Sequence, residues 1–308
     1  MIYSILKPFS VYLVLLIINF FPNYLVSSYD YDSGYDSTII SWSGYDWRVK
    51  EGYRSPGPNH FTVDAVQLTN ENKTLSLILK PMEDGNWTNG EIYSTLSLGY
   101  GTYTWIISTE TAALPAQVTL GMFTWEDRSA DVNSREIDIE LAKWGNSSDP
   151  RNIQFTVQPH TVPGNAQRFQ LSPSNGQTKA EFTWSPCGVS FRTYKYDLVN
   201  NSSEQFITHT DTVNHVLSDN EKVHINLWLW ASEQPDTQGR PVKVDIESFT
   251  FTPLTETDAK YIVGNETIIF PLLPYIKSHV TQFNSPFMKE LATIFDFVQK
   301  FVLDKTCT

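Results

Sequence analysis

Short apolar runs rich in β-branched and aromatic residues follow one another along most of the chain, between about residues 38 and 253. Several runs alternate apolar and polar positions with a period of two, and none sustains a helical period. Clear examples lie at residues 74–79, 103–107, 118–123 and 223–228. Many short strands at this spacing predict an all-β sandwich or barrel.

The N-terminus carries a different pattern. The single cation Lys7 is followed by an apolar run that ends near Val26, just before the acidic residues 29–37. This order predicts a signal peptide over residues 1–28, cleaved ahead of an acidic N-terminal segment, and hence a secreted protein without stable membrane insertion. A signal anchor is the alternative, because the apolar run is nearly long enough to span a bilayer.

The C-terminal extension, residues 255–308, ends in a helical pattern. Ser285 suits an N-cap and Pro286 the first helical position, after which apolar residues recur at helical spacing. We expect a short helical tail, an amphipathic helix over about residues 286–303, docked on the β-sandwich. A helix that binds a membrane surface or a partner is the alternative.

Composition narrows the class of protein. The 308 residues include 22 Lys and Arg against 34 Asp and Glu, a formal net charge of −12, with 18% charged and 14% aromatic residues. So few charges and so many aromatics exclude a disordered chain, and the excess of acid argues against a nucleic-acid partner. Two cysteines exclude Cys-based zinc modules; Cys187 and Cys307 either pair or stay separate thiols.

Asn-x-Ser/Thr sequons fit the secretory route and predict N-linked glycans. Each sequon alone is a common match, and it is their number in a chain with an export signal that supports the prediction. They begin at Asn72, Asn86, Asn146, Asn200, Asn201 and Asn265.

The most informative segment is Glu-Ile-Asp-Ile-Glu at residues 136–140. In a strand, successive side chains alternate between faces, so Glu136, Asp138 and Glu140 share one face while both Ile residues point into the core. Three like charges on one face repel each other and raise the pKa of at least one carboxyl group. This repulsion disfavours a purely structural outer face and favours a catalytic group of acids.

The spacing of these acids suits hydrolysis of a glycosidic bond. The Cα atoms of Glu136 and Glu140 lie about 13 Å apart on an extended strand, and side chains that lean together bring the carboxyl groups closer. Retaining glycosidases hold two carboxyl groups about 5–5.5 Å apart and inverting ones about 6.5–9.5 Å. The strand spacing permits either stereochemistry.

The segment at 136–140 resembles the active-site signature of glycoside hydrolase family 16, the clan of lichenases, laminarinases and xyloglucan-active enzymes. Further landmarks occur in the family's order, and the likeness covers roughly residues 38–254. They are EIYST at 91–95, GYGTY at 99–103, MFTW at 122–125, IQF at 153–155, FTWSP at 182–186 and NLW at 226–228.

The resemblance implies a concanavalin-A-like β-jelly-roll sandwich with a cleft across its concave sheet, and cleavage of β-glucan with retention of anomeric configuration. By family role, Glu136 is the nucleophile, Glu140 the general acid and then base, and Asp138 tunes the nucleophile. The signature lacks the residue that typical laminarinases insert before the last acid. Tyr93 stands where lichenases carry an Arg, so one substrate-contacting cation is missing.

Sugar rings bind on flat apolar platforms with polar groups at their rims. By register with the family pattern, Trp125 and Trp228 are the predicted platforms, with core packing as the alternative for each. For Trp105 and Trp184 we favour core packing, and Trp144 is a candidate for the rim of the cleft. The predicted partners for sugar hydroxyls are Asn226, Glu91 and Asn59.

No cofactor or metal is expected. The histidines are scattered without metal-ligand spacing, and no acid cluster marks the structural calcium that the family resemblance allows. The sequence thus predicts a secreted retaining endo-β-glycanase that hydrolyses β-glucan polysaccharide through a glycosyl-enzyme intermediate. A transglycosylase that uses the same site and a lectin-like module that binds glycan without turnover are the alternatives.

Overall fold

A computed structural model of the chain describes residues 38–127, 129, 133–173, 177–197, 202–211, 216, 218–254, 260–263 and 266–269. Cys187 is disulfide-bonded, and Cys307 lies outside the described residues. Also outside them lie the predicted signal peptide, the acidic segment 29–37, the C-terminal helix, and the sequons at Asn200, Asn201 and Asn265.

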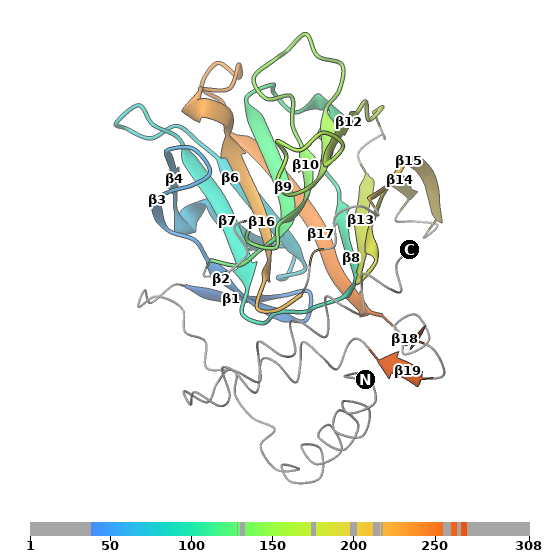
Figure 1. The fold of residues 1–308 in the computed structure, drawn as a ribbon. Helices are drawn as coiled ribbons and strands as arrows, with labels where there is room; N and C mark the ends of the chain where they lie inside the picture. Colours follow the sequence, from blue (N-terminus) through green and yellow to red (C-terminus); the bar gives the residue numbers. More distant parts are fainter. Residues whose placement is uncertain are drawn as a thin grey trace. The chain divides into compact units, whose positions relative to one another are not determined.

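Most described strands belong to two large sheets, which are antiparallel except where β4 pairs with β7 (Figure 1). The first sheet has the order β1-β2-β7-β16-β9-β10-β11-β12, and the β3–β4 hairpin joins it through β7. Its strands are β1 (Ile39–Trp42), β2 (Tyr45–Val49), β3 (Gly52–Arg54), β4 (Asn59–Phe61), β7 (Thr88–Ser94), β9 (Val118–Trp125), β10 (Ile137–Leu141), β11 (Ile153–Val157), β12 (Ala166–Phe169) and β16 (Lys222–Leu229).

The second sheet has the order β15-β14-β13-β8-β17-β6-β5. Its strands are β5 (Val66–Thr69), β6 (Thr74–Leu79), β8 (Gly101–Ile107), β13 (Thr178–Ser185), β14 (Gly188–Asp197), β15 (Ser202–Asp211) and β17 (Val242–Pro253). A separate hairpin pairs β18 (Lys260–Val263) with β19 (Glu266–Ile269). Single turns of 3₁₀ helix form η1 (Val63–Ala65), η2 (Thr111–Ala113) and η3 (Trp230–Ser232).

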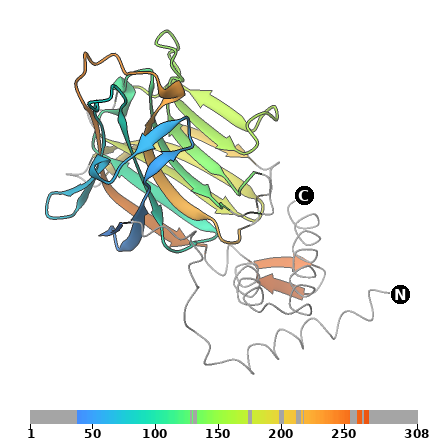
Figure 2. The same cartoon turned by 90° about the vertical axis from the view of Figure 1, so that its left-hand side faces the viewer.

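The two large sheets pack face to face around one hydrophobic core (Figure 2). Aromatic rings meet across the layers: Phe155 of β11 stacks on Phe191 of β14 at 5.0 Å, and Trp47 of β2 lies edge-on to a ring of β17. Trp105 and Trp184 are fully buried, as expected for core residues. The all-β jelly-roll sandwich predicted from the sequence is confirmed.

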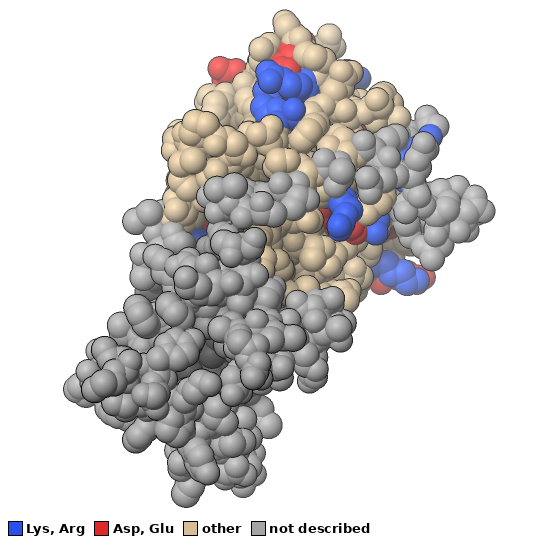
Figure 3. Space-filling view, turned by 45° about the vertical axis from the view of Figure 1, so that its right-hand side comes forward, with Lys and Arg blue, Asp and Glu red and all other residues tan. Residues whose placement is uncertain are grey.

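Charges are sparse on the face drawn in Figure 3, where a few basic and acidic groups are separated by uncharged surface. Among the described residues, no helix combines the length and the apolar character that crossing a bilayer requires. The sequon residues within the described part of the chain, Asn72, Asn86 and Asn146, are exposed.

Candidate active site

The structure brings the three acids of the 136–140 motif together at β10. Ile137 and Ile139 are fully buried in the core, so alternation along the strand directs Asp138 and Glu140 to the opposite face. Glu136 immediately precedes the strand, and its side chain forms a hydrogen bond with that of Asp138. Asp138 is only 3% exposed, whereas Glu136 and Glu140 are half-buried.

Neighbouring strands fix the backbone on both sides of Glu136. The Thr124 hydroxyl of β9 donates a hydrogen bond to the carbonyl oxygen of Arg135 (2.8 Å) and accepts one from the N–H of Ile137 (3.2 Å). The carbonyl oxygen of Glu136 itself accepts a hydrogen bond from the N–H of Gln158 (3.1 Å). These bonds hold the first acid in register with the other two.

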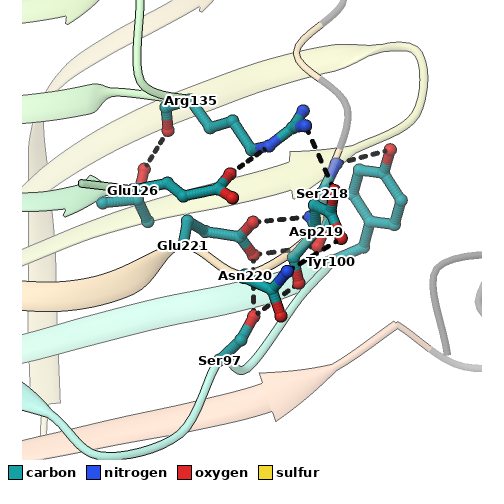
Figure 4. A network of polar contacts seen from close by, with 9 residues as sticks. Ser97, Tyr100, Glu126, Arg135, Ser218, Asp219, Asn220 and Glu221 are labelled. Atoms are coloured by element: carbon teal, nitrogen blue, oxygen red, sulfur yellow. Dashed lines mark hydrogen bonds and ion pairs between the residues drawn. The ribbon is translucent and has the colours of Figure 1, made fainter. Parts of the chain in front are cut away.

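Arg135 anchors the turn that leads into β10 (Figure 4). Its Nε donates to Glu126 Oε2 at 2.5 Å and its Nη2 to Asp219 Oδ2 at 3.3 Å. The N–H of Asp219 in turn donates to Glu221 Oε2 at 2.7 Å. Ser134 and Arg135 have φ values of +53° and +54°, a left-handed backbone that residues other than glycine adopt at a cost. The charged contacts of Arg135 therefore stabilise a strained turn directly before the acids.

A hydrogen-bonded amide orients Asp138. Gln158 Nε2 donates to Asp138 Oδ2 at 3.0 Å. Gln158 Oε1 accepts a hydrogen bond from the N–H of His160 at 2.8 Å, which fixes the direction of the amide. Asp138 Oδ2 is therefore kept as an acceptor.

Burial raises the pKa of all three carboxyl groups. For Glu136 and Glu140, burial is the largest cause, and the negative charge of Asp138 raises both pKa values further. Burial also raises the pKa of Asp138, while hydrogen bonds from Gln158 and Glu136 lower it. The net result is a pKa of about 7. The group of acids consequently retains protons near neutral pH, as general acid catalysis requires.

One row of paired residues runs from Glu140 across the sheet through Gly121 of β9 and Asn226 of β16 to Glu91 of β7. The N–H of Gly121 donates to Asn226 Oδ1 at 3.1 Å. A Cβ atom at Gly121 would lie 2.4 Å from the same oxygen, so glycine is needed to seat this amide. Asn226 Nδ2 donates to Glu91 Oε2 at 3.3 Å, which places two predicted substrate contacts on the face of the acids.

Glu91 is the ionised group of this row. Lys50, which follows β2, places its Nζ 2.8 Å from Glu91 Oε2, and His224 Nδ1 lies 2.9 Å from Glu91 Oε1. Burial opposes ionisation, but the charge of Lys50 and the contact with His224 hold the pKa of Glu91 at about 2. Lys50 thus places a cation on the face that also carries Tyr93. Tyr93 is the residue that stands where the family resemblance leads us to expect an Arg.

An aromatic row lies beside the first one. Asp138 is paired with Phe123, Phe123 with His224, and His224 with Tyr93. The rings of Phe123 and His224 stack at 4.8 Å, and those of His224 and Tyr93 at 5.2 Å. His224 is therefore a packed residue with a carboxylate partner.

The predicted platforms lie on the same face at either end of the acids. Trp125 is half-buried at the end of β9 nearest Glu136, and its Nε1 donates to Asp127 Oδ1 at 2.9 Å. Trp228 is 6% exposed and packs 6.1 Å from the half-buried ring of Trp144.

Asn59 lies near the same end of β16 but is held by the backbone. Its side chain is 3% exposed, and Nδ2 donates to the carbonyl oxygens of Pro56 (2.8 Å) and Leu229 (3.0 Å). One amide hydrogen bonds within the turn before β4, and the other joins β4 to the end of β16. The side-chain oxygen accepts a long hydrogen bond from Ser232 Oγ (3.4 Å) and is the atom left for a sugar hydroxyl.

The residues missing from the set predicted from the sequence include Lys50, Arg135, Gln158 and Trp230, whose ring lies 5.0 Å from that of Trp144. Gln158 and Trp230 continue alternating patterns that are visible in the sequence, at 154–158 and 226–230. Lys50 continues a similar alternation at 46–50, but its partner Glu91, like the partners of Arg135, is identified only in space. Among the described residues, no group of three or more His, Cys, Asp or Glu side chains is arranged to hold a metal ion.

No protein-family model and no curated protein sequence matches the chain, but many solved structures share its fold. The β-glucanase of Bacillus licheniformis is 18% identical, with a TM-score of 0.53 over 72% of this chain and 95% of that one. A glycoside hydrolase family 16 endo-glucanase from Bacteroides ovatus, in complex with G4G3G-2F-DNP, is 12% identical, with a TM-score of 0.51 over 67% and 94%.

A third protein with this fold is an immunostimulatory antigen and pseudo β-1,3-glucanase of Mycobacterium tuberculosis. It is 17% identical, with a TM-score of 0.51 over 68% of this chain and 91% of that one. At these identities the likeness shows a shared fold. The chain has a jelly-roll sandwich, the fold that the Bacillus β-glucanase, the family 16 endo-glucanase and a laminarinase from Flavobacterium share.

Proposed function

We propose that the chain is an endo-acting β-glucanase of the glycoside hydrolase family 16 type. The observation that carries the proposal is the group formed by Glu136, Asp138 and Glu140 on one face of the sheet, at the start of two rows of polar and aromatic side chains. A structural face gains nothing from three clustered acids, whereas glycosidases need one ionised and one protonated carboxyl group. The fold shared with β-glucanases supports the same function.

In the proposed reaction Glu136 attacks the anomeric carbon of a glucosyl unit while Glu140 gives its proton to the leaving glycosidic oxygen. A glycosyl-enzyme ester forms and the leaving chain departs with that proton. Glu140, now ionised, takes a proton from a water molecule whose oxygen attacks the same carbon and frees the Glu136 carboxylate. Two displacements at one carbon retain its configuration.

Asp138 is suited to hold the proton that Glu136 must lack in order to attack. The amide of Gln158 keeps Asp138 Oδ2 as an acceptor, so a proton on Asp138 belongs on Oδ1. In the free protein the hydrogen bond between the two side chains favours the proton on Glu136, because it raises the pKa of Glu136 and lowers that of Asp138. The attack therefore requires this proton to move to Asp138, whose Oδ1 would then donate to the Glu136 carboxylate.

The proposed substrate is a β-glucan chain that lies over the face of the acids. Trp125 and Trp144 would stack on its rings, with the buried Trp228 packed against Trp144. Its hydroxyl groups would bond to Asn226, Glu91 and Asn59. No metal or cofactor takes part in these steps. Secretion and N-linked glycans belong to the same proposal and rest on the sequence pattern of residues 1–28 and on the sequons.

The test is an incubation of the protein with mixed-linkage β-glucan, β-1,3-glucan and xyloglucan. We expect new reducing ends from at least one of them, and proton NMR of the first products should show the β anomer before mutarotation. The α anomer as first product would contradict retention, and the absence of new reducing ends from all three would contradict hydrolysis.

The same incubation with a labelled acceptor oligosaccharide separates the remaining functions. Labelled polymer at high acceptor concentration would indicate transglycosylation through the same intermediate. Binding of glucan with neither product nor transfer would indicate a lectin-like module.

A further inference from the structure

Three indole rings meet beyond the Glu140 end of the acids. Trp144 follows β10, Trp228 lies in β16, and Trp230 begins η3. Their ring centroids are 6.1 Å apart for Trp144 and Trp228, 5.0 Å for Trp144 and Trp230, and 6.2 Å for Trp228 and Trp230. Trp228 is buried behind the other two, while Trp230 is 40% exposed.

This cluster is separate from the packed interior. Trp42, Trp47, Trp105 and Trp184 are almost fully buried between the sheets, and the hydrophobic core contains none of the three clustered tryptophans. Single exposed apolar side chains are common on protein surfaces, whereas exposed aromatic rings that cluster mark ligand-binding grooves and interaction sites. Core packing therefore does not explain Trp230.

A chain of contacts connects the cluster to the acids. Trp144 Nε1 donates to Gln154 Oε1 at 3.1 Å, and Gln154 is the register partner of Glu140. Gln154 Nε2 donates in turn to Thr156 Oγ1 at 3.1 Å, and Thr156 is the register partner of Asp138. The indole of Trp144 is thus tied to the face that carries the acids.

The two loops that carry the rings are both hydrogen-bonded to the segment just before β9. The N–H of Gly145 donates to the carbonyl oxygen of Ala116, and the N–H of Trp230 to that of Gln117, both at 2.8 Å. Gly145 has a φ of +74°, and a Cβ atom there would lie 3.1 Å from Cδ1 of Trp230. The backbone at Gly145 therefore supports the Trp230 ring at close range.

The backbone at these rings is also unusual. Trp144, Ala231 and Ser232 have φ values of +52°, +52° and +56°. Side chains with a Cβ atom disfavour this left-handed region, and such strain concentrates at sites where a ligand is bound. Strain on both loops directs Trp144 and Trp230 toward each other.

We propose that Trp144 and Trp230 form an additional glucan-binding subsite, which stacks a β-linked glucosyl residue beyond the unit held at the acids. The inference rests on the proposed function, because it assigns the same polysaccharide chain to both places. Pre-organised rings bind a sugar face without first being ordered, so the subsite adds affinity only for chains long enough to reach it.

The test compares Trp230→Ala with the unchanged protein on a series of β-glucan oligosaccharides of increasing length. We expect kcat/KM to fall about tenfold on the long members and to stay unchanged on the shortest one cleaved. Trp230→Leu, which keeps apolar packing on Gly145 but lacks a flat face, should show the same loss, and Trp230→Phe should largely restore activity. Leu96→Ala, at a site 53% exposed and away from the cluster, is the matched control.

A second measurement needs no turnover. In a Glu136→Gln background, titration with the longest oligosaccharide should give a dissociation constant about tenfold higher when Trp230→Ala is added. A uniform loss on all chain lengths, or unchanged binding and kinetics in both Trp230→Ala and Trp230→Leu, would overturn the subsite. Failure of the proposed function is a different result, in which the unchanged protein releases no reducing ends from any glucan.

Discussion

Replacing Glu136 or Glu140 by Gln is expected to lower glucan hydrolysis by at least about a thousandfold. Gln keeps the size of each side chain but can neither attack the anomeric carbon nor transfer a proton. The loss should appear in kcat rather than in binding, because the rows of residues that hold the sugar remain in place. Initial rates of reducing-end release measure it.

The same two variants are expected to be more stable than the unchanged protein at neutral pH. Burial raises the pKa of Glu136 and of Glu140 above the unfolded values, so folding at neutral pH either takes up protons or buries charge. The two carboxyl groups therefore lower the free energy of unfolding at neutral pH. This effect is absent below the unfolded pKa of 4.5 and grows as the pH rises toward the folded pKa. Melting temperatures at pH 7 should rise by about 2–4 °C for each kcal/mol recovered and converge near pH 4.

Glu71→Gln is the matched control for both measurements. Its side chain is 84% exposed in a surface pair with Lys73, so neither activity nor melting temperature should change. Undiminished hydrolysis in both Glu136→Gln and Glu140→Gln would contradict the assignment of the active site. Inactive variants that are also less stable at pH 7 would contradict the account of its electrostatics.

Replacing Arg135 by Met is expected to give the largest loss of stability, about 3–5 kcal/mol. The guanidinium and its partners Glu126 and Asp219 have side chains only 9–12% exposed. Removal of the cation leaves two carboxylates nearly buried without compensation, close to the buried Glu221. Urea unfolding followed by tryptophan fluorescence measures the change.

Lys73→Met removes a cation from the exposed pair with Glu71 and serves as the control, with an expected change below about 1 kcal/mol. Arg135→Lys should recover part of the stability, because it restores the charge but not the geometry of two separate donors. An Arg135→Met variant no less stable than Lys73→Met would contradict the role of this buried network.

The strands of the sandwich are predictable because short apolar runs rich in β-branched and aromatic residues are separated by turn residues. The alternating runs at 74–79, 103–107, 118–123 and 223–228 lie within β6, β8, β9 and β16. The order of strands has no comparable local signal: Ile92 of β7 pairs with Ile225 of β16, far away in the sequence. The resemblance to a known family, rather than periodicity, distinguishes a jelly roll from other sandwiches.

The same physics divides the site into predictable and unpredictable parts. Alternation alone places Glu136, Asp138 and Glu140 on one face, since the intervening Ile residues must be buried. Trp230 follows Trp228 by two positions with Leu229 between them, so alternation also marks it. In contrast, the ion pair of Lys50 and Glu91 joins residues 41 positions apart and exists only because β2 lies next to β7.

The central claim is that Glu136 forms a covalent bond to a glucosyl unit. Incubation with a 2-deoxy-2-fluoro β-glucan oligosaccharide that carries a dinitrophenyl leaving group should trap this ester, because fluorine slows its hydrolysis more than the loss of the activated leaving group. Mass spectrometry is expected to find one added glycosyl group on the peptide that contains Glu136, and none in the Glu136→Gln variant. A glucan-hydrolysing preparation with no adduct, or with the adduct on another residue, would contradict the account.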